Sequence, residues 1–217
     1  MGKDITIEIC SDGAAAALEA FRCGADRVEL CRDLSTGGLT PSHEDIAAVT
    51  AAKGDRAVNV LIRPREGDFV YDGKEIGEML EDIRFCAGNG VDGVVIGALK
   101  DDGSVNLDTV RKLADTAHGL GMSVTFHRAI DCAADIFAAL EDAISAGAER
   151  VLSSGGRATA YEGRQTLAAM VEQAAGRTSV MPGSGVTGEN ARTIIEETGA
   201  VEIHGSRTGI IAGLRKN

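Results

Sequence analysis

Residues 23–31 read Cys-Gly-Ala-Asp-Arg-Val-Glu-Leu-Cys, a junction in which a glycine ends a helix and an acidic residue leads into a strand. A similar junction recurs as Asn-Gly-Val-Asp-Gly at residues 89–93 and as Ala-Gly-Ala-Glu-Arg at residues 146–150. Glycine is favoured at the left-handed position that closes a helix. The recurrence therefore indicates one strand–helix unit that is used repeatedly along the chain.

Short apolar runs alternate with longer alanine-rich segments throughout the sequence. The runs predict eight strands: Ile5–Cys10, Arg27–Cys31, Ala57–Ile62, Gly93–Gly97, Ser123–His127, Arg150–Ser153, Thr178–Pro182 and Val201–His204. The segments between them predict seven helices, near Gly13–Cys23, Ser42–Lys53, Lys74–Asn89, Leu107–Leu120, Ala133–Ala146, Tyr161–Ala175 and Thr187–Thr198. Strands separated by helices pair in parallel, and eight equal units favour a closed barrel over an open sheet. We therefore predict an α/β fold, a TIM-type (β/α)8 barrel, as a single domain over residues 1–217.

The end of the chain is short for such a barrel. Only Gly205–Asn217, thirteen residues, follows the last predicted strand. The final outer helix is therefore expected to be short or missing. A second copy of the chain would then cover part of the barrel wall, so we predict a homo-oligomer.

Composition excludes several classes of function. A net charge of −11 without any basic run argues against nucleic-acid binding, because phosphate contacts need clustered Lys and Arg. No apolar run approaches the length of a membrane span, and nothing resembles a signal peptide, so we expect a cytoplasmic protein without membrane partners. The five cysteines are odd in number and include no C-x-x-C pair, which argues against a disulfide framework or a structural zinc site.

Side-chain alternation predicts which residues point into the barrel. In the first predicted strand, Ile7 and Ile9 share one face, whereas Glu8 and Cys10 share the other. The apolar face must meet the outer helices, so the second face points inward. The same alternation places these charged or titratable side chains inside the barrel: Glu8, Glu29, Arg63, His127, Glu202 and His204.

Charges inside such a barrel are unusual, because branched aliphatic side chains normally fill this space. A buried charge is costly unless it is paired, so we expect the acids to form a network with Arg63, His127 and His204. The network either fills the barrel structurally or serves a function. Function is favoured for Arg63 and the two histidines, which stand at C-terminal strand ends, where barrels of this type carry their active sites.

Two cysteines end neighbouring strands, Cys10 in Glu-Ile-Cys and Cys31 in Glu-Leu-Cys. Neighbouring strands lie about 4.8 Å apart, so both thiols should point inward within reach of one another. A pair of thiolates suits a soft ion such as Cu(I). The alternative is that both are small buried cysteines that behave as hydrophobic side chains.

The loop after the third strand carries Arg63 and Arg65. Two arginines so close together can clamp a carboxylate or a phosphate, although they can also be a solvated pair in a loop. After the fifth strand, His127 is followed by Arg128 and Asp131, which suits acid–base chemistry or anion binding. We expect the catalytic groups to be His127 with Glu8, Glu29 or Asp131, which would transfer protons.

The seventh and eighth strands end in turns that suit an anion. The first turn contains Gly183, Ser184 and Gly185, and the second contains His204, Gly205 and Ser206. Many barrels of this type hold a phosphate after these two strands. The helix predicted to start near residue 187 would point its N-terminus at the same place.

Seven motifs of this sequence occur in one order that resembles the CutC copper-homeostasis family. The matching stretches are Gly24–Cys31, Gly37–Ser42, Ile62–Arg65 with Gly67–Phe69, Thr125–Ala129 with Asp131, Ser153–Gly156, Met181–Gly183 with Gly185–Val186, and His204–Ser206. The sequence departs from the family at Ser184, where a third glycine is common, and in its shorter C-terminal tail.

The resemblance implies a TIM-type barrel, usually cytoplasmic, that takes part in copper handling. It implies Cu(I) ligands at Cys10 and Cys31. The family's polar cluster at the barrel mouth corresponds here to these residues: Glu8, Glu29, Arg63, Arg65, His127 and Arg128.

These patterns lead to three candidate functions. The first is a Cu(I)-binding protein of copper homeostasis. The alternative is a TIM-barrel enzyme of the lyase, isomerase or hydrolase type that acts on a small anionic or phosphorylated metabolite. The third is a barrel that senses such a ligand without turning it over.

Overall fold

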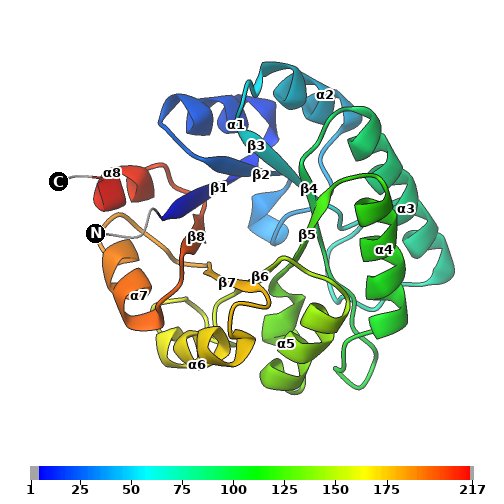
Figure 1. Ribbon diagram of the computed structural model, residues 1–217. Coiled ribbons are helices and arrows are strands. Elements are labelled where there is room, and N and C mark those ends of the chain that lie inside the picture. Colours follow the sequence, from blue (N-terminus) through cyan, green and yellow to red (C-terminus); the bar gives the residue numbers. More distant parts are fainter. Residues whose placement is uncertain (1–4, 216–217) are drawn as a thin grey trace.

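The computed structural model describes residues 5–215, which form eight parallel strands inside a ring of helices (Figure 1). The strands are β1 (Thr6–Asp12), β2 (Arg27–Cys31), β3 (Ala57–Leu61), β4 (Gly93–Ile96), β5 (Ser123–Phe126), β6 (Arg150–Ser153), β7 (Ser179–Pro182) and β8 (Glu202–Gly205). The helices are α1 (Gly13–Arg22), α2 (His43–Ala52), α3 (Gly73–Gly88), α4 (Leu107–Gly119), α5 (Ile136–Ser145), α6 (Arg164–Ala174), α7 (Ala191–Thr198) and α8 (Gly209–Arg215). The predicted TIM-type barrel is confirmed.

The barrel is almost closed. Backbone ladders join the strands in the order β7-β6-β5-β4-β3-β2-β1-β8, and no ladder joins β7 to β8 in the described part of the chain. The register sets Glu8 of β1 level with Arg27 of β2 and with His204 of β8. Two residues further along these strands, Cys10 of β1 lies level with Glu29 of β2. Residues from three strands are thereby brought to the same depth of the barrel.

Two apolar regions of different size stabilise the fold. The larger lies between the strands and the helices and includes Ile7 and Ile9, both buried. The smaller lies inside the barrel and contains only Cys10, Cys31, Leu61 and Val95, with Leu34 packed against it. The predicted alternation in β1 is therefore correct, and much of the remaining interior is polar.

The last helix is short, as predicted, and it nevertheless covers β8. Helix α8 has seven residues, closes the ring between α7 and α1, and buries Ile210 and Ile211 (Figure 1). Arg215 at its end donates a hydrogen bond of 2.7 Å to the carbonyl of Gly24 and pairs with Asp26. A partner subunit is therefore not required to cover this wall, and the homo-oligomer stays a prediction.

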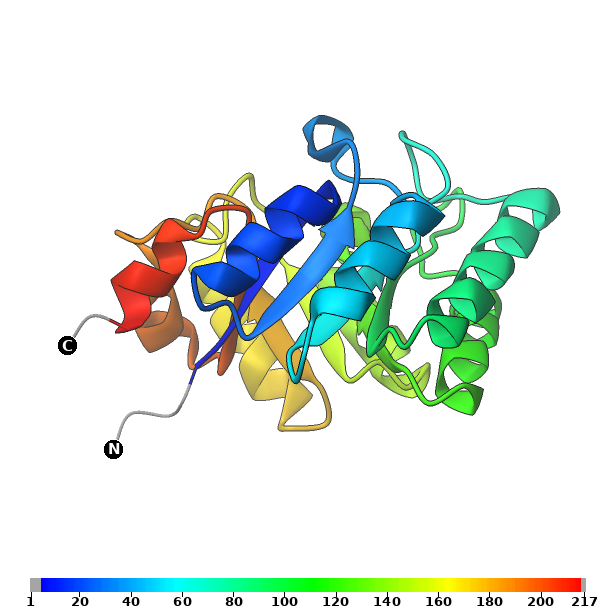
Figure 2. The same ribbon diagram turned by 90° about the horizontal axis from the view of Figure 1, so that it is seen from above.

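The loops after the strands form the mouth of the barrel. Two of them contain 3-10 turns, η1 (Leu34–Thr36) after β2 and η2 (Arg128–Cys132) after β5. The loop with η1 rises above the strand ends in Figure 2. No helix among residues 5–215 combines the length and the apolar character that crossing a bilayer requires.

Candidate functional site

A cavity of about 650 Å³ opens at the mouth of the barrel. Of the residues predicted for the site, it is lined by Cys10, Glu29, Arg63, His127, Arg128, Ser184, Gly185, His204, Gly205 and Ser206. The remaining predicted residues do not line it: Glu8, Cys31, Arg65, Asp131 and Gly183. Ten of the fifteen predicted residues therefore line one cavity, and their contacts separate the residues that face it from those that support it.

Below the cavity, Glu8 is the centre of a buried ion network. Its carboxylate accepts hydrogen bonds from Arg27 and, at 3.0 Å, from Asn59, and it contacts Nδ1 of His204 at 2.8 Å. Arg27 also pairs with Glu202. Burial opposes the charged carboxylate, but Arg27 and then His204 outweigh burial and lower the pKa of Glu8 to about 2. Glu8 is therefore ionised and supports His204 from below.

Sequence reasoning missed Arg27 as the cation of this network. The prediction paired the acids with Arg63 and both histidines, but Arg63 and His127 take no part in the network. The signal was present, because Arg27 stands two residues before Glu29 and so shares its inward face. Arg27 is only 8% exposed and bridges two acids.

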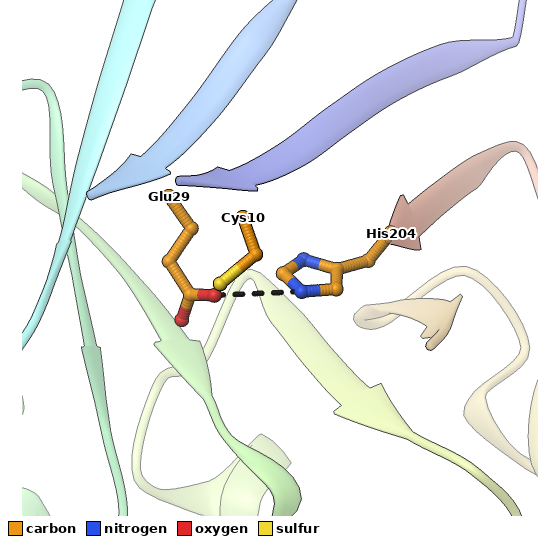
Figure 3. A group of neighbouring side chains, drawn as sticks. All are labelled: Cys10, Glu29 and His204. Carbon is orange, nitrogen blue, oxygen red and sulfur yellow. Dashed lines mark ion pairs between the residues drawn. The ribbon is translucent and has the colours of Figure 1, made fainter. Parts of the chain in front are cut away.

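Above this network, Cys10, Glu29 and His204 face one another at the floor of the cavity (Figure 3). The Cys10 thiol, a Glu29 carboxylate oxygen and a His204 ring nitrogen all lie within 4.8 Å of one another. Nδ1 of His204 contacts Glu8, so Nε2 points at Glu29, 3.4 Å away. This arrangement can hold a metal ion or pass a proton between imidazole and carboxylate.

Two titratable groups at this floor, Glu29 and His204, have raised pKa values. Burial raises the pKa of Glu29, and the nearby charge of Glu8 adds to the effect. Burial disfavours the imidazolium of His204, but the hydrogen bond with Glu8 and the charges of both glutamates raise its pKa. Both pKa values are therefore raised, and the imidazole and the carboxylate lie 3.4 Å apart, which places a proton donor and a proton acceptor side by side.

The two predicted metal ligands lie in contact. Cys10 Sγ and Cys31 Sγ are 3.5 Å apart, which confirms that the two thiols meet. Cys31 is fully buried behind Cys10, which faces the cavity. The contact with Cys31, burial and the charge of Glu29 all raise the pKa of the Cys10 thiol. Both the metal site and the apolar alternative remain compatible with this geometry.

Arg63 is buried, with 5% exposure, and its contacts are unusual for a charged group. Nη1 donates to the carbonyls of Thr36 and Gly38, at 3.1 and 3.0 Å, and Nη2 donates to that of Gly67 at 2.9 Å. Its Nε has no partner among the described residues. Within residues 5–215, no carboxylate neutralises this cation.

His127 follows β5 and caps the turn η2. Its Nδ1 accepts a hydrogen bond of 3.1 Å from the amide of Ala129, and its Nε2 has no partner in the described chain. The proton therefore sits on Nε2 in the neutral ring. Burial and the charge of Arg63 lower the pKa of His127 to about 3, so the ring stays neutral and acts as a donor. The expectation that His127 joins the acids in a network is wrong.

The second arginine of the predicted clamp lies outside the cavity. Arg65 pairs with Asp68 at 2.8 Å and with Glu75 at 2.5 Å, and its Nη2 donates to the carbonyl of Val70 at 2.6 Å. These partners hold its guanidinium on the far side of the loop, so the predicted clamp of Arg63 and Arg65 is wrong. Arg63 alone faces the cavity.

Asp131 anchors a loop rather than facing a ligand. It accepts hydrogen bonds from the Ser153 hydroxyl at 2.6 Å and from the amides of Ser154 and Gly156, both at 3.0 Å. It also pairs with Arg128, whose side chain lines the cavity. The predicted catalytic use of Asp131 finds no support, because these donors occupy both of its oxygens.

The turns after β7 and β8 lie at the rim. Ser184 and Gly185 both have left-handed backbones, with φ of 79° and 64°, and both line the cavity. Gly183 lies behind them and donates to the carbonyl of Ser153. Helix α7 begins at Ala191, so the expected helix N-terminus near residue 187 is wrong. The exposed Arg207, which sequence reasoning passed over, also lines this rim.

Comparisons with known proteins agree with this architecture. The CutC family model matches residues 5–209. A CutC family protein of Xanthomonas axonopodis pv. citri is 51% identical over 95% of this chain and 85% of its own length. Another, from Parabacteroides distasonis, is 43% identical over 94% of this chain and 84% of its own.

A solved structure is also similar: CutC from Streptococcus agalactiae, a protein provisionally assigned to copper homeostasis. It is 31% identical, with a TM-score of 0.88 over 94% of this chain and 99% of its own. A deoxyribose-phosphate aldolase homologue from Coccidioides immitis shares the fold alone, at 14% identity and a TM-score of 0.69 over 96% of this chain and 83% of its own. The family model and the relatives together show that this chain belongs to the CutC family.

Proposed function

We propose that this protein binds Cu(I) in the cytoplasm as part of copper homeostasis, with Cys10 and Cys31 as the ligands. The observation that carries the proposal is the contact of the two thiols, 3.5 Å apart, of which Cys10 faces an open cavity. The provisional assignment of the Streptococcus agalactiae relative to copper homeostasis supports the same direction.

The donor set suits a soft monovalent ion. Two sulfurs are the ligands that Cu(I) prefers, and the His204 nitrogen and Glu29 oxygen lie within 4.8 Å of the Cys10 sulfur. The raised pKa of Cys10 means that the thiol holds its proton in the free protein. Binding must therefore release protons, and the apparent affinity should rise with pH.

An anaerobic titration with Cu(I) against a competing chelator tests this proposal. The Cys10→Ser, Cys31→Ser double variant should bind at least about tenfold more weakly, as expected for the loss of both soft ligands. Cys23→Ser is the matched control, because Cys23 is exposed and lies outside the mouth cavity. Equal affinity of the double variant and the control would contradict the proposal.

A second candidate function is an enzyme that acts on a small anionic or phosphorylated metabolite. The cavity favours it, because about 650 Å³ is the size of a small-molecule site and far exceeds a metal ion. His204 and Glu29 would transfer the proton, and Glu8 would orient His204. None of the lysines in the described chain lines the cavity, so the chemistry would not use a lysine imine.

Thermal shift with phosphate, sugar phosphates and small carboxylates tests the second candidate. A ligand that stabilises the protein should then be assayed for turnover with the wild type and with His204→Gln. Turnover that His204→Gln abolishes supports an enzyme, whereas stabilisation without turnover supports a sensor. If none of these anions stabilises the protein at millimolar concentration, the second candidate fails.

A further inference from the structure

Two side chains that line the cavity each carry a buried hydrogen-bond donor without a partner among the described residues. The donors are Nε of Arg63 and Nε2 of His127, on side chains that are 5% and 4% exposed. The Phe69 ring packs against both groups, with its centroid 4.9 Å from Cζ of Arg63 and 5.0 Å from the centroid of the His127 ring. A buried donor without an acceptor destabilises the folded protein, and a charged donor does so more strongly. Two such donors beside one aromatic ring point to a ligand.

We propose that Arg63 and His127 form a subsite for the carboxylate of a short organic acid. The inference rests on the second candidate function and names the class of its ligand. The three residues of the subsite come from the loop after β3 and the end of β5, across the cavity from Cys10 and His204. The anion of the second candidate function would then be a carboxylate, and His127 would bind it by donating a hydrogen bond.

The charge of the subsite requires an anion. Arginine remains protonated in proteins, and Arg63 is buried with only carbonyl oxygens as partners. Neutral acceptors satisfy its hydrogen bonds but leave its positive charge without compensation. A bound carboxylate would supply both the missing acceptor and the missing charge.

The number of donors favours a carboxylate over a phosphate. A carboxylate presents two oxygens in one plane, which matches one N–H from each of two rigid, flat side chains. A phosphate carries more charge and more oxygens, and proteins usually meet it with a series of backbone amides. The Phe69 ring beside His127 offers no such donor, and the amide of Ala129 is already directed at Nδ1 of His127.

The subsite also defines how the ligand would lie. With its carboxylate between Arg63 and His127, the rest of a short acid would extend through the same cavity toward Glu29 and His204. These two groups lie 3.4 Å apart at the floor of the cavity. The geometry therefore selects a short carboxylic acid that bears a second polar group, such as a hydroxy acid or a dicarboxylic acid.

The test uses glycolate, malonate and succinate as probes, with inorganic phosphate for comparison, and measures binding calorimetrically to the full chain. At least one carboxylate should bind in a saturable manner and more tightly than phosphate. Arg63→Gln should weaken this binding by roughly tenfold or more, as expected for a lost charged hydrogen bond. Arg65→Gln is the matched control, two residues away and outside the cavity, and should bind as the wild type does.

Arg63 also holds three loop carbonyls, so His127→Asn provides a variant that is safer for folding. Asparagine can keep the acceptor for the amide of Ala129 and lacks a donor at the position of Nε2. It should weaken carboxylate binding severalfold with an unchanged circular dichroism spectrum. In the wild type, the imidazole nitrogen resonance of His127 should shift when the carboxylate is added.

Three outcomes overturn the proposal. They are unchanged binding by His127→Asn, an equal loss in Arg65→Gln, and the absence of saturable binding by any of the three carboxylates. If phosphate binds and the carboxylates do not, the subsite is wrong while the second candidate function stands. If no anion binds at all, both fail together.

Discussion

On the β8–β1–β2 side of the barrel interior, the buried charges are paired with opposite charges of the protein, whereas on the β3–β5 side the buried charge of Arg63 has no such partner within residues 5–215. Glu8 is bound by Arg27 and His204, and Arg27 is bound in turn by Glu202. Arg63 has only carbonyl partners. The two sides are equally buried, so burial alone does not explain the difference.

The difference separates groups that hold the site from groups that meet a ligand. A closed network such as that of Glu8 fixes the position of each member and leaves little capacity for an added group. An open set of donors keeps that capacity at a cost in stability, which a ligand can recover. Function is therefore better sought where the protein leaves polar groups unsatisfied than where it places the most charges.

The largest change in stability is expected from breaking the ion network around Glu8. Glu8→Gln removes one charge from a buried network and leaves Arg27 and His204 with too few acids. The free energy of unfolding, measured in urea, should fall by about 3–5 kcal/mol, the usual cost of removing one partner of a buried ion pair. Glu197→Gln breaks the exposed pair with Arg164 and serves as the control, with little change expected. Equal losses in the two variants would show that the network is not special.

An intermediate change in stability is expected from His127 when the pH is lowered. His127 has a pKa of about 3 when folded and 6.5 in its reference state, so the unfolded chain binds a proton that the folded chain refuses. Stability from this group is therefore complete above about pH 7 and falls as the pH decreases toward 3. Between pH 7 and 5 the loss should be about 2 kcal/mol, and His127→Asn should lack this component. Parallel stability curves for the two proteins would contradict the assignment of a neutral His127.

The smallest effect is expected at Arg65, which sharpens the contrast with Arg63. Arg65 is partly exposed and its ion pairs with Asp68 and Glu75 are open to solvent screening. Arg65→Gln should therefore change the free energy of unfolding by no more than about 1 kcal/mol. Arg63→Gln should cost more, because three loop carbonyls lose a buried donor. Thermal or urea unfolding of both variants would rank them directly.

The fold and the faces of the strands could be predicted from the sequence because they depend on local periodicity. The glycine junctions and the alternation of Glu8 with Ile7 and Ile9 specify which side chains point inward. The contacts among those side chains were harder to predict, because they depend on register and on the reach of long side chains. Arg27 reaches Glu8 since the register sets them level, and no pattern within either strand states that.

The predicted contacts differ from the observed ones where residues close together in the sequence point in different directions. Arg63 and Arg65 are two residues apart, yet the loop directs one into the cavity and the other toward Glu75. The place of Asp131 four residues after His127 suggests a catalytic role, but the turn η2 directs its side chain to Ser153 and Ser154 at the end of β6. These outcomes depend on loop conformation, which local composition specifies weakly.

The complete burial of Cys31 behind Cys10 has a kinetic consequence. Under the proposed copper function, an ion entering from the cavity would reach the Cys10 sulfur first and would gain the second sulfur only by moving inward. Loading and unloading would thus be sequential, with a transient state held by Cys10 and its neighbours. Release should be slow unless an incoming thiol takes the ion from Cys10, so such a barrel would hand its cargo over by direct exchange rather than by free diffusion.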